Sequence, residues 1–254
     1  MYRTIFFLFD EYRNGDRILF KLHFTEFECG YLRKCSGLCR ILIPRYDVCI
    51  DFLYGVYDVS RGSIEINGVD IRKYNLESLR TQIGYVAQKA HMFKGSIRSN
   101  ICFGKPEASV EEMVHAATVA QASNFISTRE HGYEDEIAED GTNISGGQKQ
   151  RLSIARVILK KPSLYIYDDS FSALDFKTDA TLRKALKPEV KNAIFFVVAQ
   201  RISTIMDSDM IIVLDEGQII GMGTHAQLLK DCSVYQEIAH SQLTQKELDD
   251  YERN

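Results

Sequence analysis

The clearest chemical signal in the sequence is the run ISGGQKQR at residues 144–151, which leads into an apolar helical pattern from Leu152 to Lys160. Serine is a residue type that begins helices, so Ser145 is a natural cap. Gly146 and Gly147 leave backbone N–H groups uncovered at the positive end of the helix dipole. Such a helix start can bind the terminal phosphate of a nucleotide. The alternative is a glycine-rich turn that only caps a helix.

Two adjacent carboxylates follow an apolar run of strand length. Leu164 to Tyr167 precede Asp168 and Asp169, and the run SALD follows at residues 172–175. A carboxylate at the end of a buried strand can hold Mg²⁺ through water, and its neighbour can orient an attacking water. A surface turn would also fit these two acidic residues taken alone. Their position after the glycine run favours the metal site.

In combination these runs resemble the nucleotide-binding domain of exporter-type ABC transporters. ISGGQKQR is similar to the ABC signature, the strand ending at Asp168 to Walker B, and residues 172–175 to the D-loop. Gln88 in the run YVAQ is similar to the Q-loop glutamine, and Glu136 to Gly141 resemble the loop by which exporter-type domains contact their membrane helices. The resemblance extends from about Val56 to Leu243.

The resemblance implies an α/β fold, a P-loop NTPase-like ABC ATPase core at residues 57–243 with a helical subdomain at about 89–160. It implies ATP hydrolysis with ATP and Mg²⁺ as cofactors. It assigns nucleotide binding to Gln88, Ser145, Gly146, Gly147, Gln148 and Asp175, Mg²⁺ binding to Asp168 and Gln88, and catalysis to Asp169 and Gln200.

The implied partners are a second ABC nucleotide-binding domain, in a head-to-tail dimer, and the transmembrane domain of a transporter. The longest apolar run near the start, Ile5 to Phe9, is far shorter than the roughly 20 residues of a spanning helix. We therefore expect other polypeptide to supply the membrane spans, and this chain to lie at the cytoplasmic face of the membrane.

The family's phosphate-binding loop, GxxxxGK[ST], has no recognisable counterpart in residues 1–56. Its expected window, LCRILIPRYDVCID at residues 38–51, contains no glycine and no lysine. Without that loop the β- and γ-phosphates lose their main contacts. The loss of pattern predicts a truncated or frame-disrupted gene product, and the alternative is a true but divergent N-terminal segment.

Two further departures concern catalysis. Asp169 stands where the family usually carries a glutamate, and a carboxylate withdrawn by roughly 1 Å can cost on the order of a hundredfold in rate. Gln200 stands where the family has its switch histidine, and an amide cannot take up a proton near neutral pH. Both changes predict a degenerate hydrolytic site. Because the signature is preserved, we expect this chain to be the degenerate half of a heterodimeric exporter.

Two other functions are compatible with parts of this sequence. A non-catalytic partner or regulator would keep the signature surface without binding nucleotide in its own pocket, and a measured affinity separates it from the motor domain. A DNA-repair or chromosome-associated ATPase would carry a long coiled coil between Gln88 and the signature, where this chain has a compact segment without heptads. A formal net charge of -4 also gives no reason to expect a nucleic-acid partner.

The elements that must position these residues follow an alternating pattern. Compact apolar runs predict buried strands at residues 83–86, 164–167, 193–198 and 210–214, with helical patterns between them. Ser109, followed by Glu111 and Glu112, predicts the start of a helix. Residues 1–56 show no sustained period of either kind, and residues 244–254 form a polar tail for which we expect fraying or disorder.

Overall fold

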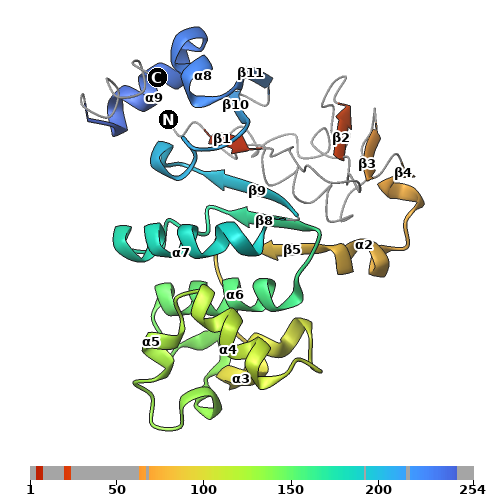
Figure 1. Ribbon diagram of the computed structural model, residues 1–254, viewed down its shortest axis with the longest axis vertical. Coiled ribbons are helices and arrows are strands. Elements are labelled where there is room, and N and C mark those ends of the chain that lie inside the picture. The colour runs from red at the N-terminus through yellow and green to blue at the C-terminus, as the bar shows by residue number, and fades with distance from the viewer. Residues whose placement is uncertain are drawn as a thin grey trace, which may run out of the picture. The chain divides into compact units, whose positions relative to one another are not determined.

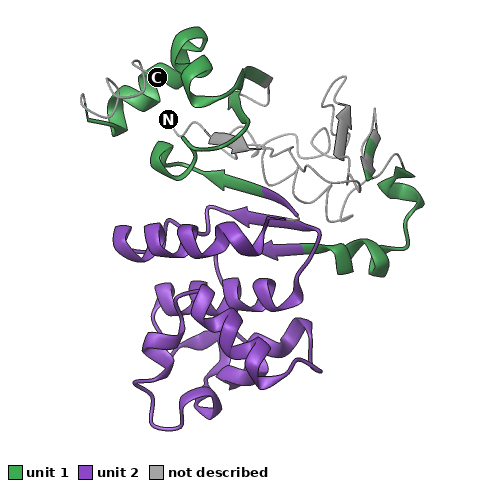
Figure 2. Ribbon diagram, viewed as in Figure 1, with its two compact units in different colours: residues 1–83, 196–254 green, residues 84–195 purple. Residues whose placement is uncertain are grey.

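The computed structural model describes residues 4–7, 20–23, 63–66, 69–191, 193–215 and 218–244. The expected position of the phosphate-binding loop and most of the polar tail lie outside these residues. The chain divides into two compact units (Figure 2), one made of residues 1–83 and 196–254 and the other of residues 84–195. We call them unit 1 and unit 2.

Unit 2 carries most of the residues predicted to do chemistry. Its principal strands are β5 (Ile83–Val86), which begins at the unit boundary, and β8 (Leu164–Asp168), which are neighbours in one sheet (Figure 1). Helices connect the two strands along the chain, as a parallel arrangement requires. All five residues of β8 are buried, in agreement with the expectation of a strand covered on both faces.

The segment between β5 and β8 is mainly helical. It contains α3 (Ile97–Ile101), α4 (Val110–Val119), α5 (Ser123–Ile126) and α6 (Gly146–Lys160), together with a short hairpin of β6 (Gly95–Ser96) and β7 (Glu136–Ile137). The 3-10 turns of this segment are η2 (Cys102–Gly104), η3 (Gly132–Glu134) and η4 (Glu139–Gly141). After β8 comes α7 (Phe176–Glu189).

Helix α6 is the central helix of unit 2. It buries a broad apolar side that includes Leu152, Ile154, Ala155, Ile158 and Leu159. At Gly84 of β5, an added Cβ would lie 2.5 Å from the Val157 side chain, so strand and helix are packed with no room for a larger residue. The helix ends at Lys160, and the left-handed backbone of the C-cap residue Lys161 stops it before Pro162.

Unit 1 contains further strands of its own. Their order is β11 (Gln218–Gly223), β10 (Ile211–Asp215), β1 (Thr4–Phe7) and β9 (Ile194–Ala199), with the unit boundary within β9. Strand β1 runs antiparallel to both neighbours, with Phe6 opposite Ile212 on one side and Val198 on the other. Strands β9 and β10 therefore run in the same direction.

A smaller sheet in unit 1 consists of β2 (Phe20–His23), β3 (Ser63–Ile66) and β4 (Val69–Asp70). The turn η1 (Ile71–Lys73) and helix α2 (Leu76–Gln82) follow it. Strands β1 and β2 lie in the part of the sequence from which we predicted no regular structure. Each spans four residues, which is too short for a period to stand out, and pairing with distant strands supplies the backbone hydrogen bonds.

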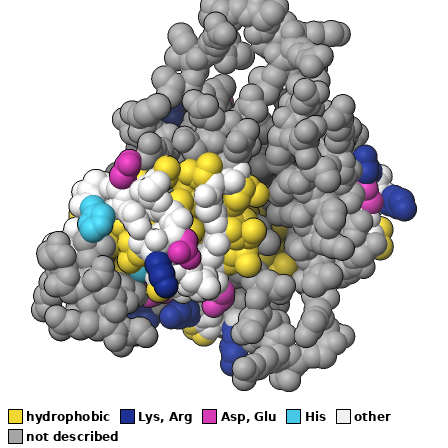
Figure 3. Space-filling view, turned by 90° about the horizontal axis from the view of Figure 1, so that it is seen from above, with side chains coloured by type: hydrophobic (Ala, Val, Ile, Leu, Met, Phe, Trp, Pro, Cys, Tyr) yellow, Lys and Arg dark blue, Asp and Glu magenta, His cyan; other side chains and the backbone are white. Residues whose placement is uncertain are grey.

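The remaining elements of unit 1 are the turn η5 (Ile202–Thr204) and helices α8 (His225–Asp231) and α9 (Ser233–Gln242). Strand β11 ends the order of the described sheet and exposes the side chains of Ile219, Ile220 and Met222. Hydrophobic side chains are visible among the described residues in Figure 3. None of the helices among the described residues is long and apolar enough to cross a membrane.

Candidate nucleotide site

The ISGGQ run begins helix α6, as predicted. Ser145 is the N-cap residue: its Oγ accepts a hydrogen bond from the backbone N–H of Gln148, 3.3 Å away. The Gln148 side chain accepts in return from the N–H of Ser145 at 3.0 Å, which completes a capping box. Ser145 and Gly146 are exposed, and an added Cβ at Gly146 would meet no atom within 4 Å. This helix start is therefore open to an anion from outside the chain.

Gly147 faces the turn that follows β8. A Cβ at this position would lie 3.3 Å from the backbone oxygen of Ala173, so a larger residue would press on the D-loop-like run. Arg151, one turn further along α6, lies over the Phe125 ring with its guanidinium carbon 5.2 Å from the ring centroid. Burial lowers the pKa of Arg151, and the nearby negative charge of Asp175 opposes that shift. The signature helix and the D-loop-like run are thus packed together.

Asp168 ends strand β8 and is buried. Its Oδ2 accepts a hydrogen bond from the hydroxyl of Tyr85 on β5, at 3.1 Å. The aspartate is therefore placed by the strand and fixed by a neighbour in the same unit. We did not predict a role for Tyr85, although its position three residues before Gln88 on an apolar strand is a signal that could have suggested one.

Asp169 has an unusual backbone conformation. Its φ is 41°, in the left-handed region, where aspartate is among the few non-glycine residues that are tolerated. Ser172 holds this turn, since its Oγ donates to the Asp169 carbonyl at 2.7 Å and its N–H donates to the same oxygen at 3.2 Å. The carboxylate Oδ2 of Asp169 accepts from Nε2 of Gln88 at 3.2 Å. The structure thus brings Gln88 and Asp169 into direct contact.

Two buried polar residues fix the backbone just before Gln88. The Ser170 hydroxyl is fully buried and lies 2.8 Å from the carbonyl oxygen of Val86. The Gln150 side chain, 1% exposed, donates to the carbonyl of Ala87 at 3.1 Å. Sequence reasoning passed over both residues. Gln150 lies in the polar run of residues 148–151, where the sequence does not mark it as buried, and Ser170 resembles an ordinary turn residue.

Asp175 caps the next helix. Its carboxylate accepts from the backbone N–H of Thr178 at 2.9 Å and from the Thr178 hydroxyl at 2.7 Å. The backbone hydrogen bond from Thr178 is the main reason that the pKa of Asp175 lies below its usual value. The structure therefore gives Asp175 a capping role at the start of α7, and the nucleotide-binding role remains a prediction.

Gln200 is the predicted site residue that lies in unit 1; the others lie in unit 2. It follows β9 directly, and its side chain is exposed. Its backbone carbonyl accepts a hydrogen bond from Nε2 of Gln242 at 2.9 Å, and Oε1 of Gln242 accepts from the N–H of Ile202 at the same distance. Helix α9 therefore holds the backbone around Gln200, while the side chain points to solvent.

The oxygen atoms of Asp168 and Gln88 are of the type that Mg²⁺ prefers. Among the described residues no group of three or more His, Cys, Asp or Glu side chains could form a complete protein cage for a metal. Mg²⁺ usually keeps several waters and is held by one or two carboxylates together with substrate phosphates. Asp168 offers a carboxylate of this kind, and Mg²⁺ binding by Asp168 and Gln88 remains a prediction.

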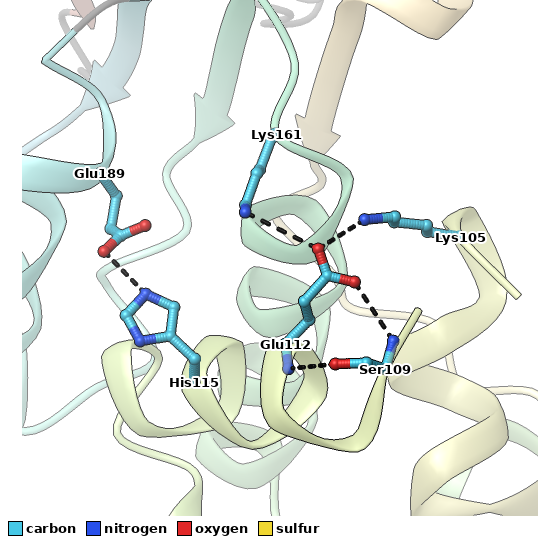
Figure 4. Close-up of polar contacts among 6 residues, drawn as sticks. All are labelled: Lys105, Ser109, Glu112, His115, Lys161 and Glu189. Atoms are coloured by element: carbon cyan, nitrogen blue, oxygen red, sulfur yellow. Dashed lines mark hydrogen bonds and ion pairs between the residues drawn. The ribbon is translucent and has the colours of Figure 1, made fainter. Parts of the chain in front are cut away.

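A second set of polar contacts ties helix α4 to the ends of its neighbours (Figure 4). Glu112 forms a capping box with Ser109 and accepts from Nζ of Lys105 at 2.7 Å, and Nζ of Lys161 lies 3.8 Å from the same oxygen. The hydrogen bond from Lys105 is the largest cause of the lowered pKa of Glu112. His115 and Glu189 meet at 2.9 Å, which links α4 to the last turn of α7.

Comparison with known proteins shows which family this chain resembles. Residues 48–172 match the family described as ABC transporter. A Bacillus subtilis protein, YgaD, whose name includes the words multidrug export ATP-binding/permease protein, is 44% identical over 197 residues, which is 78% of this chain and 32% of the relative. Heavy metal tolerance factor 1 of Caenorhabditis elegans is 40% identical over 197 residues, covering 78% of this chain and 25% of the relative.

Among solved structures, a bacterial Atm1-family ABC exporter with ATP bound matches with a TM-score of 0.75 and 35% identity, over 78% of this chain and 35% of that chain. This chain thus spans about a third or less of the length of the proteins named here. The similarity confirms the predicted fold class.

Proposed function

Given that this chain belongs to the ABC transporter family, we propose that it is the ATP-binding module of an exporter and acts at the cytoplasmic face of a membrane. We further propose that it forms the degenerate half of a head-to-tail pair. The observation that carries this proposal is an asymmetry. The helix start at Ser145 and Gly146 keeps the family pattern and is open to an outside ligand, whereas Asp169 and Gln200 depart from that pattern.

In such a pair each residue has a distinct role. Ser145, Gly146 and Gly147 would meet the γ-phosphate of ATP held by the partner domain, because the N–H groups of a helix start favour negative charge. Asp168 and Gln88 would supply oxygen ligands to Mg²⁺ in the site of this chain. Bound Mg²⁺ neutralises charge that develops on the phosphates. The competent partner site would then carry most of the turnover.

An exposed aromatic pair supports contact with another polypeptide. Phe93 and Phe103 are 48% and 58% exposed, and their rings stack with centroids 4.3 Å apart. The guanidinium carbon of Arg156 lies over the Phe93 ring at 5.4 Å and over the Phe103 ring at 5.7 Å from the centroid, and its Nε donates to the backbone oxygen of Asn100. Rigid exposed aromatic residues beside an arginine are typical of protein interfaces. Since Phe93 lies five residues after Gln88, we assign this surface to the transmembrane partner.

The test is a pair of substitutions in the full-length protein assembled with its partner subunit. Ser145→Arg would place a bulky cation at the helix start and should abolish most ATPase activity by blocking the competent site. Asp169→Asn should leave most of the activity. Equal damage from both substitutions would contradict the asymmetric model, and the two sites would then have to be treated as equivalent.

A second candidate function is a non-catalytic partner or regulator. It is favoured by the sequence of residues 38–51, which contains no glycine or lysine where the phosphate-binding loop is expected. In that case this chain would complete the site of another domain without binding nucleotide itself. Measurement of its own affinity for Mg-ATP separates the two functions.

A further inference from the structure

Asp169 differs from the other left-handed residues of the described chain in being buried. Four non-glycine residues there have positive φ: Gln121, Asp140, Lys161 and Asp169. Asp169 is 7% exposed, whereas Asp140 and Lys161 are exposed and Gln121 is partly so. A left-handed backbone is unfavourable for most residues and persists where the surroundings determine it. At Asp169 the determining contacts are the two hydrogen bonds from Ser172 to its carbonyl oxygen.

The same turn places the carboxylate within hydrogen-bond distance of the Gln88 amide. Three consecutive residues each form a hydrogen bond with a different distant side chain. Val86 bonds with Ser170, Ala87 with Gln150 and Gln88 with Asp169. The first two contacts fix backbone atoms. The third is the contact that orients a side chain, with 3.2 Å between Nε2 of Gln88 and Oδ2 of Asp169.

We propose that Asp169 is a positioning residue for Gln88, and that its carboxylate serves as a hydrogen-bond acceptor. This inference rests on the proposed function, in which Gln88 contacts the nucleotide and its metal. The short side chain of Asp169, on a left-handed turn, reaches the amide of Gln88. Asp169 accepts from Nε2 of Gln88, and Oε1 of Gln88 can then face a ligand. Aspartate at this position is then favoured by the turn, and a carboxylate engaged with Gln88 agrees with the degenerate site of the proposed function.

The two roles respond differently to substitution. Asparagine keeps an acceptor oxygen at the same distance from the backbone and tolerates the left-handed region, but it cannot act as a base. Glycine adopts a positive φ without strain and removes the acceptor. Asp140→Gly is the matched control. Asp140 is also a left-handed aspartate, with φ 54°, but it is exposed, and the control makes the same change from aspartate to glycine.

The experiment follows the side-chain amide protons of Gln88 by NMR in the complete chain, with the signal assigned from its loss in Gln88→Glu. Exchange with water should be roughly fivefold faster in Asp169→Gly than in the unsubstituted chain, and unchanged in Asp169→Asn and Asp140→Gly. Equal exchange rates in Asp169→Gly and the unsubstituted chain would overturn the proposal. Acceleration by Asp169→Asn equal to that by Asp169→Gly would also overturn it.

A second measurement separates this inference from the proposed function. In the assembled full-length transporter, a positioning role predicts that Asp169→Gly raises the dissociation constant for Mg-ATP at the degenerate site more than Asp169→Asn does. A catalytic carboxylate would make both substitutions lower kcat equally, and this outcome would contradict the positioning role. The exchange experiment needs no nucleotide, so it can succeed even if the chain proves to be no motor domain.

Discussion

At the scale of single residues, backbone conformation decides what a side chain can do. Asp169 and its neighbour Asp168 are adjacent carboxylates of identical type, yet one ends a strand and the other begins a left-handed turn. Asp168 is bound by Tyr85 and Asp169 by Gln88. The left-handed φ of Asp169 gives the two carboxylates different surroundings. Asp168 is the candidate metal ligand, and Asp169 is the residue proposed to orient the Gln88 amide.

Substituting Asp169 by the family's glutamate tests whether the left-handed backbone at this position favours aspartate. Asp169→Glu should lower the free energy of unfolding by about 1 kcal/mol, because glutamate is poorly tolerated at a positive φ. Asp169→Asn should change it by less than about 0.5 kcal/mol, since asparagine adopts this region readily. Urea denaturation of the three chains measures both values. A glutamate variant as stable as the unsubstituted chain would argue against strain at this turn. We also expect that glutamate alone does not restore hydrolysis.

At the scale of elements, buried polar side chains fix the loops that surround the helices. Asn100 of α3 is 1% exposed, and its amide both accepts from the N–H of Phe93 at 2.9 Å and donates to the carbonyl of Phe93 at 2.8 Å. Arg156 of α6 donates to the backbone and side-chain oxygens of the same residue. The aromatic pair is thus held in place through Asn100.

Asn100→Ala should therefore destabilise the fold by about 1 to 3 kcal/mol, because it leaves backbone groups of Phe93 without their partners. Unfolding in urea measures the loss. The exposed Ser99→Ala at the neighbouring position serves as a control and should cost less. If the Asn100 variant kept full stability, water would have to replace the lost hydrogen bonds.

Helices α8 and α9 are joined by a buried pair. Nδ1 of His225 and the hydroxyl of Tyr235 are 2.7 Å apart, and both residues are buried. Burial is the largest cause of the lowered pKa of His225, and the charge of Asp207 opposes it. A folded-state pKa below the unfolded value means that the unfolded chain binds the proton more readily.

The contribution of His225 to stability should be present above the unfolded pKa, near 6.5, and be lost as the pH falls through the folded value. His225→Asn, which keeps an acceptor for Tyr235, should therefore lose less stability than the unsubstituted chain between pH 7.5 and 5. Thermal unfolding across this range gives the comparison. The exposed His240→Asn is the control, and its curve should follow that of the unsubstituted chain. Parallel curves for all three would contradict the assignment.

At the scale of the whole molecule, the question is whether this chain holds a nucleotide by itself. Asp168 and Gln88 offer oxygen ligands, but a triphosphate normally needs a loop of backbone N–H groups and a lysine to compensate its charge. The sequence at residues 38–51 supplies neither a glycine nor a lysine. Ser145 and Gly146, by contrast, form an open helix start that fits a phosphate held by another domain.

We expect the isolated chain to bind Mg-ATP weakly and to hydrolyse it negligibly, because two oxygen ligands cannot replace the phosphate contacts. Titration calorimetry should give a dissociation constant well above the micromolar range. Asp168→Asn should weaken any residual binding that depends on Mg²⁺, with Asp231→Asn as an exposed control. Micromolar affinity for Mg-ATP would contradict this expectation and would point to a phosphate-binding loop that the sequence pattern does not reveal.

Much of the fold follows from local patterns in the sequence. The cap at Ser145, the buried strand that ends at Asp168 and the helix start at Ser109 depend on residues within a few positions of each other. Their hydrogen bonds and burial can therefore be predicted from short runs of neighbouring residues. The order of motifs alone also led to the correct family.

The tertiary structure decided which of these residues meet. Gln88 and Asp169 are 81 residues apart, and Ser170 and Val86 are 84 apart. These contacts depend on the pairing of strands that a helical segment separates, and no local pattern encodes them. The left-handed turn at Asp169 depends on Ser172 as well as on the packed end of β8, and four-residue strands such as β1 form only where distant strands supply their hydrogen bonds. The sequence by itself determined which chemical groups are available, and the packing of distant segments determined which of them act on one another.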